Sequence, residues 1–156
     1  MPEMKTSIRL LMTSFGSGLI YSDVSLNDME EPLFLTRAQI ERLHDKSLLK
    51  FGGSSGVRDE GLIQSALASA KNVYFYGNGD LFDIAAAYAF HLAQAQAFVD
   101  GNKRAGIGAA LTFLEVNRIR VLATDDALYG AMIDIAEKRL DKSGLAKILR
   151  DSAKAI

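Results

Sequence analysis

Five consecutive residues in the middle of the chain combine groups that could hold phosphate and a metal ion together: Asp100, Gly101, Asn102, Lys103 and Arg104. A glycine lets the backbone form a turn whose N–H groups contact an anion, and the first N–H groups of a helix carry partial positive charge. Lys103 and Arg104 add full charges. Because bound phosphate repels a carboxylate unless a cation lies between them, we expect Asp100 to be a magnesium ligand shared with phosphate oxygens.

A simpler interpretation of the same residues is a turn at the start of a helix. In this alternative Asn102 is the N-cap, and Lys103 and Arg104 are solvated charges without a ligand. Spacing alone favours this alternative, because short motifs occur by chance.

Two helices are expected to position these residues. The first begins at the N-cap Asp80 and runs to about residue 95, because apolar residues recur along it every three or four positions. The second runs from Lys103 to Glu115 and ends at Asn117, a residue type that tolerates a left-handed turn. The candidate site is therefore the loop between two long helices.

Four further helices are predicted from apolar periodicity and capping residues. The first begins with a capping box formed by Thr36 and Gln39 and places His44 on its outer face. The expected ranges are 36–52, from Asp59 to about residue 70, from Thr124 to about residue 140, and from Ser143 onward.

Two segments have the composition of β structure. Residues 72–76 are β-branched or aromatic and precede a Gly-Asn-Gly turn, which predicts a short strand or hairpin. Residues 119–122 suit a brief extended piece. Residues 1–32 lack a helical period, so we expect an N-terminal extension followed by an all-α, six-helix domain over 33–156 with one short β-hairpin.

Composition excludes several classes of protein. The chain has 156 residues, 49% hydrophobic and 24% charged, which is ordinary for one globular domain and unlike a disordered chain. The net charge of −1 provides no global attraction for nucleic acid or membrane, and we expect neither as a partner. No signal peptide or membrane span is visible, so we expect a cytoplasmic protein.

Composition also limits the metals that the chain can hold. There are no cysteines and only two histidines, His44 and His91, so thiolate and histidine-rich metal sites are excluded. Any metal must be held by oxygen, which favours magnesium.

The segment Phe98-Val99-Asp100-Gly101-Asn102-Lys103-Arg104 resembles the core of the Fic/Doc motif, usually written H-x-F-x-D/E-G-N-K/G-R, and its lysine resembles the Doc (death-on-curing) toxin branch. The likeness extends from about Leu35 to the C-terminus. Its strongest stretches are residues 51–53, 56–62, 80–90 and 110–117.

This resemblance implies a six-helix protein that binds ATP with magnesium and transfers part of it to a hydroxyl of a target. Asp100 would hold magnesium. Gly101, Asn102 and Lys103 would bind phosphates, and Arg104 would join them and neutralise charge on the transferred group. Doc toxins phosphorylate elongation factor Tu and are neutralised by an antitoxin, so the resemblance implies both kinds of partner.

Two positions favour phosphoryl over adenylyl transfer, and one departs from the family. Adenylylating relatives usually have glycine in place of Lys103 and a second arginine in place of Ile107. Where the family has its catalytic histidine, this chain has Gln96, whose amide does not titrate near neutral pH. His91 lies about 140° around the predicted helix from Gln96 and is a poor substitute.

Two further residue sets have competing interpretations. Residues 72–76 would be the family's flap, a hairpin that holds a target segment by strand addition, or else would simply cover the core. Arg58 would contact phosphate or form a surface ion pair, and the ion pair is favoured. Overall, we expect either a Doc-like toxin impaired by the loss of its base or a catalytically inactive nucleotide- or antitoxin-binding protein.

Overall fold

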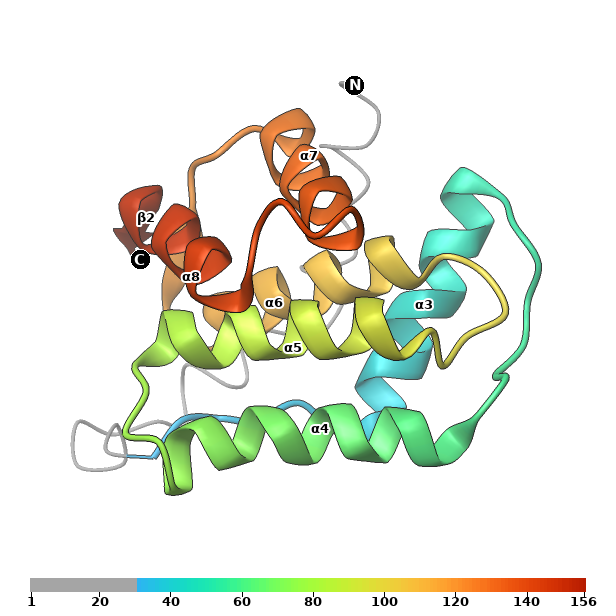
Figure 1. Ribbon diagram of the computed structural model, residues 1–156, viewed down its shortest axis with the longest axis horizontal. Helices are drawn as coiled ribbons and strands as arrows, with labels where there is room; N and C mark the ends of the chain where they lie inside the picture. Colours follow the sequence, from blue (N-terminus) through green and yellow to red (C-terminus); the bar gives the residue numbers. More distant parts are fainter. Residues whose placement is uncertain (1–30) are drawn as a thin grey trace.

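The computed structural model describes residues 31–156, and expectations for the preceding segment lie outside the described residues. Six helices and two short strands follow one another along this range (Figure 1). They are α3 (Arg37–Phe51), α4 (Glu60–Phe75), α5 (Leu81–Ala95), α6 (Asn102–Val116), β1 (Ile119–Val121), α7 (Asp125–Ala136), α8 (Lys142–Asp151) and β2 (Ala153–Ala155). The expected all-α, six-helix architecture is confirmed.

Helix α5 is the centre of the domain. It runs between α4 on one side and α7 and α8 on the other, with α6 packed along it (Figure 1). Small residues permit this close packing. A Cβ atom on Gly106 would lie 2.7 Å from the carbonyl oxygen of Ala89, and one on Gly108 would lie 2.6 Å from Leu43 Cδ2. Helix α6 therefore approaches both α5 and α3 more closely than a larger side chain would allow.

The helix starts agree with the capping residues in the sequence. Thr36 and Gln39 form the predicted capping box of α3, and the side chains of Asp59, Asp80 and Thr124 cap α4, α5 and α7. The predicted boundaries of the last two helices are wrong. Helix α7 ends at Ala136, and α8 is capped by Asp141, two residues before the predicted Ser143.

The predicted β-hairpin at residues 72–76 is wrong. Residues 72–75 continue α4, and Tyr76 is its C-cap. Tertiary packing overrides the β propensity of this segment. The ring of Phe34 lies 6.0 Å from that of Tyr74 and 5.9 Å from that of Phe75, and the last turn of α4 is thereby attached to the core.

The two-stranded sheet lies elsewhere, between β1 and β2. The strands are antiparallel, with Ile119 opposite Ala155 and Val121 opposite Ala153, so the extended piece predicted at residues 119–122 is confirmed. The left-handed turn after α6 was assigned to the wrong residue. Asn117 has a φ of −99°, and the left-handed residue is Arg118, with a φ of 67°.

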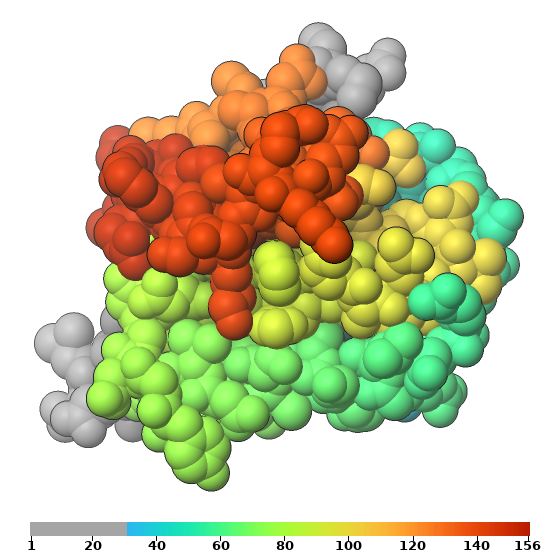
Figure 2. Space-filling model, in the orientation of Figure 1, coloured from blue at the N-terminus to red at the C-terminus, as the bar shows by residue number. Residues whose placement is uncertain are grey.

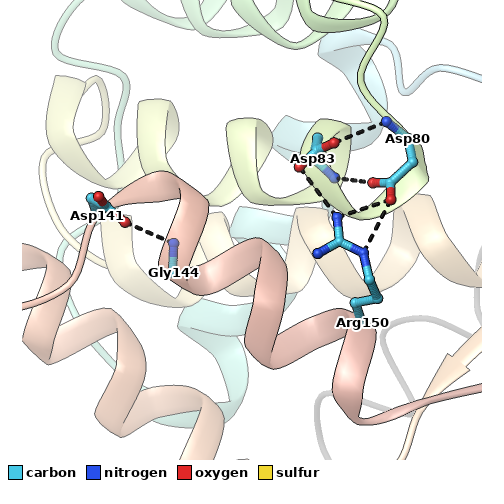
Figure 3. A network of polar contacts seen from close by, with 5 residues as sticks. All are labelled: Asp80, Asp83, Asp141, Gly144 and Arg150. Atoms are coloured by element: carbon cyan, nitrogen blue, oxygen red, sulfur yellow. Dashed lines mark hydrogen bonds and ion pairs between the residues drawn. The ribbon is translucent and has the colours of Figure 1, made fainter.

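Polar contacts fasten α8 to the start of α5 (Figure 3). The guanidinium of Arg150 donates to Asp80 Oδ2 at 2.9 and 3.1 Å and contacts Asp83 Oδ1 at 3.4 Å. Burial opposes the ionisation of Asp80, but hydrogen bonds from Asp83 and Arg150 outweigh it and hold the pKa of Asp80 below its usual value. This end of α5 is fixed, and its other end leads into the candidate site.

None of the helices within residues 31–156 is both long enough and apolar enough to cross a bilayer.

Candidate functional site

Two left-handed residues turn the chain from α5 into α6. Gln96 follows α5 with φ 50° and ψ 46°, and Gly101 precedes α6 with φ 76° and ψ 23°. Gly101 is the N-cap, and it provides no side-chain hydrogen bond to the first turn of α6. The first N–H groups of α6 are therefore left without the usual side-chain partner, which is the arrangement that favours an anion.

Asn102 holds this loop in shape. Its Oδ1 accepts from the backbone N–H of Phe98 at 3.0 Å, and its Nδ2 donates to the carbonyl of Phe98 at the same distance. The alternative in which Asn102 is the N-cap is wrong, because its amide is turned back toward Phe98. The side-chain amide of Asn102 is thus engaged within the loop, and its backbone N–H lies in the first turn of α6.

His44 on α3 lies under the loop. Its Nε2 is 2.6 Å from the carbonyl oxygen of Asp100, and its ring stacks on Phe98 with centroids 3.8 Å apart. The residue is 2% exposed. The expectation that His44 lies on an outer face is wrong, because Ile40, Leu43 and Ser47 mark the buried stripe of α3 and position 44 falls within it.

Asp100 is held as a carboxylate. Its Oδ2 accepts from the backbone N–H of Ser54 at 3.2 Å, and its Oδ1 accepts from that of Gly101 at 2.8 Å. These two hydrogen bonds hold the pKa of Asp100 below its usual value. The side chain is therefore ionised at neutral pH, as a metal ligand must be.

The segment from Gly52 to Arg58, here called the flanking loop because it lies beside residues 96–100, provides one wall. Val57 pairs with Phe98 in an antiparallel bridge, and the N–H of Val99 donates to the carbonyl of Gly56 at 3.0 Å. In Figure 2 the turquoise surface of this part of the chain borders the yellow surface of the loop. The residues flanking the candidate site are thus 52–58 and not 72–76.

The expected surface ion pair of Arg58 is not present among residues 31–156. Its backbone N–H donates to the carbonyl of Ala97 at 2.7 Å, and its guanidinium donates to the carbonyl of Ala95 at 3.3 Å. Ala95 ends α5, so Arg58 places positive charge at the negative end of that helix.

One cavity of about 400 Å³ is lined by the candidate site residues of the sequence: Gln96, Asp100, Gly101, Asn102, Lys103 and Arg104. Arg104 lies over the ring of Phe51, 4.6 Å from its centroid, which fixes the direction of the guanidinium. Tyr129 and Ala136 of α7 line the cavity as well. Sequence patterns gave no sign of this wall, because it depends on how α7 packs.

The cavity contains one carboxylate, that of Asp100, of the kind that binds magnesium together with phosphate. Among residues 31–156 no three acidic or histidine side chains converge into a metal site. Magnesium in nucleotide sites is commonly held by one or two carboxylates together with phosphate oxygens and water. A single ionised Asp100 beside Lys103 and Arg104 fits such an ion.

His91 takes no part in the cavity. Its Nε2 lies 3.2 Å from Lys142 Nζ on α8, and it is absent from the cavity lining. Burial and the neighbouring Lys142 charge hold the pKa of His91 below its usual value. Neither histidine of the described range lines the site.

A family model described as the Fic/DOC family matches residues 34–114, which include α3, α4, α5, the whole loop and all but the last two residues of α6. The chain belongs to this family. Two relatives are similar to more than two thirds of the chain. "Protein kinase doc" of Escherichia phage P1 is 29% identical over 109 residues, covering 69% of this chain and 86% of the relative. "Toxin Doc" of Mycolicibacterium smegmatis is 35% identical over 111 residues, covering 69% of this chain and 85% of that protein.

Proposed function

We propose that the protein is a Doc-like toxin whose cavity at the start of α6 binds ATP with magnesium, and whose transfer chemistry is impaired. The observation that carries the proposal is the convergence of Asp100, Lys103 and Arg104 on one cavity at a helix start that lacks a side-chain cap. Each of these features favours the phosphates of a nucleotide.

Different groups in the cavity would hold different parts of such a ligand. The first N–H groups of α6 would donate to phosphate oxygens, and Lys103 would add a point charge. Arg104, directed by its contact with Phe51, would neutralise charge on the group that is transferred. Asp100 would hold magnesium, which when bound would neutralise negative charge on the phosphates.

We favour phosphoryl over adenylyl transfer, with a hydroxyl of a translation factor such as elongation factor Tu as the acceptor. The position where adenylylating relatives have a second arginine is occupied by Ile107, which is fully buried in the core. This position therefore supplies no second cation to the cavity. A relative named "Protein kinase doc" supports the same choice.

Gln96 limits the reaction. It occupies the place of the family's histidine and lines the cavity, but a primary amide cannot take a proton from an attacking hydroxyl at neutral pH. With His91 turned toward Lys142 and His44 beneath the loop, neither described imidazole replaces it. This observation favours a second candidate function, a catalytically inactive protein that binds nucleotide or an antitoxin.

The flanking loop is the best candidate for holding the target. Gly53, Ser54 and Ser55 are exposed and lie next to the segment that forms the cavity. Exposed backbone groups allow an extended segment of another protein to add as a strand. Residues 72–76, for which the sequence favoured no single role, end helix α4 and offer no extended edge, so the flanking loop fits this role better. The toxin-named relative also supports an antitoxin as a partner.

Titration calorimetry with ATP tests the proposed ligand. The wild-type protein should bind ATP more tightly with magnesium than without it. Asp100→Ala should remove most of that difference, whereas Lys103→Ala or Arg104→Ala should weaken binding by about 1–3 kcal/mol with or without the metal. Lys147→Ala is a matched control, because Lys147 is an exposed cation on α8 paired with Asp151. Equal affinities in all five proteins would refute the site.

A further inference from the structure

We infer that His44 is a positioning residue that sets the orientation of the Asp100 carboxylate. The inference rests on the proposed function in one respect, because it explains how the proposed magnesium ligand is held. The sequence placed His44 on an outer face, and the family motif does not include it.

The first step is the hydrogen bond between His44 and the loop. A carbonyl oxygen can only accept, so the 2.6 Å contact requires that His44 Nε2 carry a hydrogen and donate it to Asp100. The imidazole cannot turn away from this partner, because its ring lies against Phe98 at 3.8 Å with an angle of 13° between the planes. The backbone of Gly101 closes the same space, since a Cβ there would lie 3.4 Å from His44 Nε2.

The second step follows from the planarity of the peptide bond. The carbonyl of Asp100 and the N–H of Gly101 belong to one rigid peptide unit and point in opposite directions. His44 holds the carbonyl end, and the N–H end donates to Asp100 Oδ1 at 2.8 Å. Fixing the carbonyl therefore aims the N–H, and the N–H fixes one oxygen of the carboxylate.

The third step connects this contact to the cavity. His44 does not line the cavity, whereas both Asp100 and Gly101 do. Its effect on a ligand must therefore pass through the Asp100–Gly101 peptide. Loss of the His44 hydrogen bond would release this peptide and with it the hydrogen bond to Asp100 Oδ1, so that the N–H of Ser54 on Oδ2 would be left to orient the carboxylate. Magnesium would be affected more than phosphate, because the start of α6 is held by the hydrogen bonds between Asn102 and Phe98, which do not involve this peptide.

Three variants separate this role from a general effect on stability. His44→Phe keeps a ring against Phe98 and replaces the donor with a C–H group. His44→Gln keeps an N–H donor that can reach the Asp100 carbonyl. Tyr88→Phe is the matched control, because Tyr88 is fully buried and its side chain also makes one hydrogen bond to the backbone, which its hydroxyl accepts from the N–H of Leu35 at 3.0 Å. Tyr88 is eight residues before Gln96, about 12 Å along the helix axis.

The first measurement is amide hydrogen exchange of peptides that cover residues 97–104, with no ligand present. His44→Phe should exchange roughly 3- to 10-fold faster than wild type in this segment, as expected for the loss of one hydrogen bond. His44→Gln should restore most of the protection, and Tyr88→Phe should leave it unchanged. Equal protection in His44→Phe and wild type, or equal changes in His44→Phe and Tyr88→Phe, would overturn the inference. If the larger ring prevents folding, His44→Ala tests the same loss.

The second measurement is calorimetric binding of ATP with and without magnesium. His44→Phe should lose roughly 3- to 10-fold in affinity with magnesium and little without it, whereas Tyr88→Phe should lose neither. A wild-type protein that binds no ATP would refute the proposed function, and the exchange data would still decide the role of His44. Wild-type binding that is identical in His44→Phe under both conditions would refute the role of His44 alone.

Discussion

Gly53 leaves room for the Asp100 carboxylate at the boundary between the flanking loop and the candidate site. A Cβ atom on Gly53 would lie 2.8 Å from Asp100 Oδ2. The neighbouring N–H of Ser54 donates to that same oxygen at 3.2 Å. The flanking loop therefore comes close enough to hold the carboxylate only because residue 53 is a glycine.

Gly53→Ala should displace the Asp100 carboxylate and reduce the magnesium dependence of ATP binding. Gly52→Ala is the control. Both glycines have positive φ angles, 78° at Gly52 and 118° at Gly53, but a Cβ on Gly52 would meet no atom within 4 Å. Both variants should lower the thermal midpoint, because alanine is strained at either position. A loss of magnesium dependence that is the same in both variants would show that contact with Asp100 is irrelevant.

Arg150→Ala should lower the thermal midpoint by roughly 2–4 °C, which corresponds to about 1 kcal/mol for a domain of this size. Arg150 connects α8 to both Asp80 and Asp83 and also lies over the ring of Phe82. Arg139→Ala is the control, since within residues 31–156 Arg139 pairs with Asp134 and Glu137, which are close to it in sequence. Calorimetric unfolding checks the comparison, and an equal effect of the two substitutions would argue against the α5–α8 link.

The free energy of unfolding should fall as the pH drops below about 6.5, in part because of His91. Burial and Lys142 hold the pKa of His91 below its usual value in the folded protein. The unfolded chain then binds the proton more readily, and the loss levels off below the folded-state pKa. The free energy of unfolding, measured with urea at several pH values between 5 and 7, should depend less on pH in His91→Gln than in wild type. An equal dependence on pH in the two proteins would contradict the role given to His91.

The capping residues predicted where helices begin, and the loop motif predicted which residues lie together at the candidate site. Thr36, Asp59, Asp80 and Thr124 each act locally, since a side chain in reach of its own helix start needs no distant partner. The adjacent residues from Asp100 to Arg104 line one cavity for a similar reason, because they share one turn.

Long-range packing was beyond the reach of sequence patterns. The aromatic residues at the end of α4 have high β propensity, and only the contact with Phe34 explains why they are helical. His44 is 56 residues from Asp100 in sequence, and Gly53 is 47 residues from it. His44 follows Ile40 by four positions, so the helical period of α3 could have indicated that His44 is buried. Nothing in that period identifies Asp100 as its partner.

Gln96→His tests the central claim, that an intact ATP site lacks only its proton acceptor. A neutral imidazole can take a proton near pH 7, and Gln96 is exposed at the cavity, so the substitution requires little repacking. The double variant Gln96→His/Arg104→Ala is the control. It has the imidazole base but lacks the Arg104 cation that would neutralise charge on the transferred group. The measurement is transfer of radiolabelled γ-phosphate from ATP with magnesium to elongation factor Tu. We predict an increase approaching 10²-fold over wild type that the double variant loses. No transfer by a Gln96→His protein that binds ATP would contradict the claim and favour the inactive binding protein.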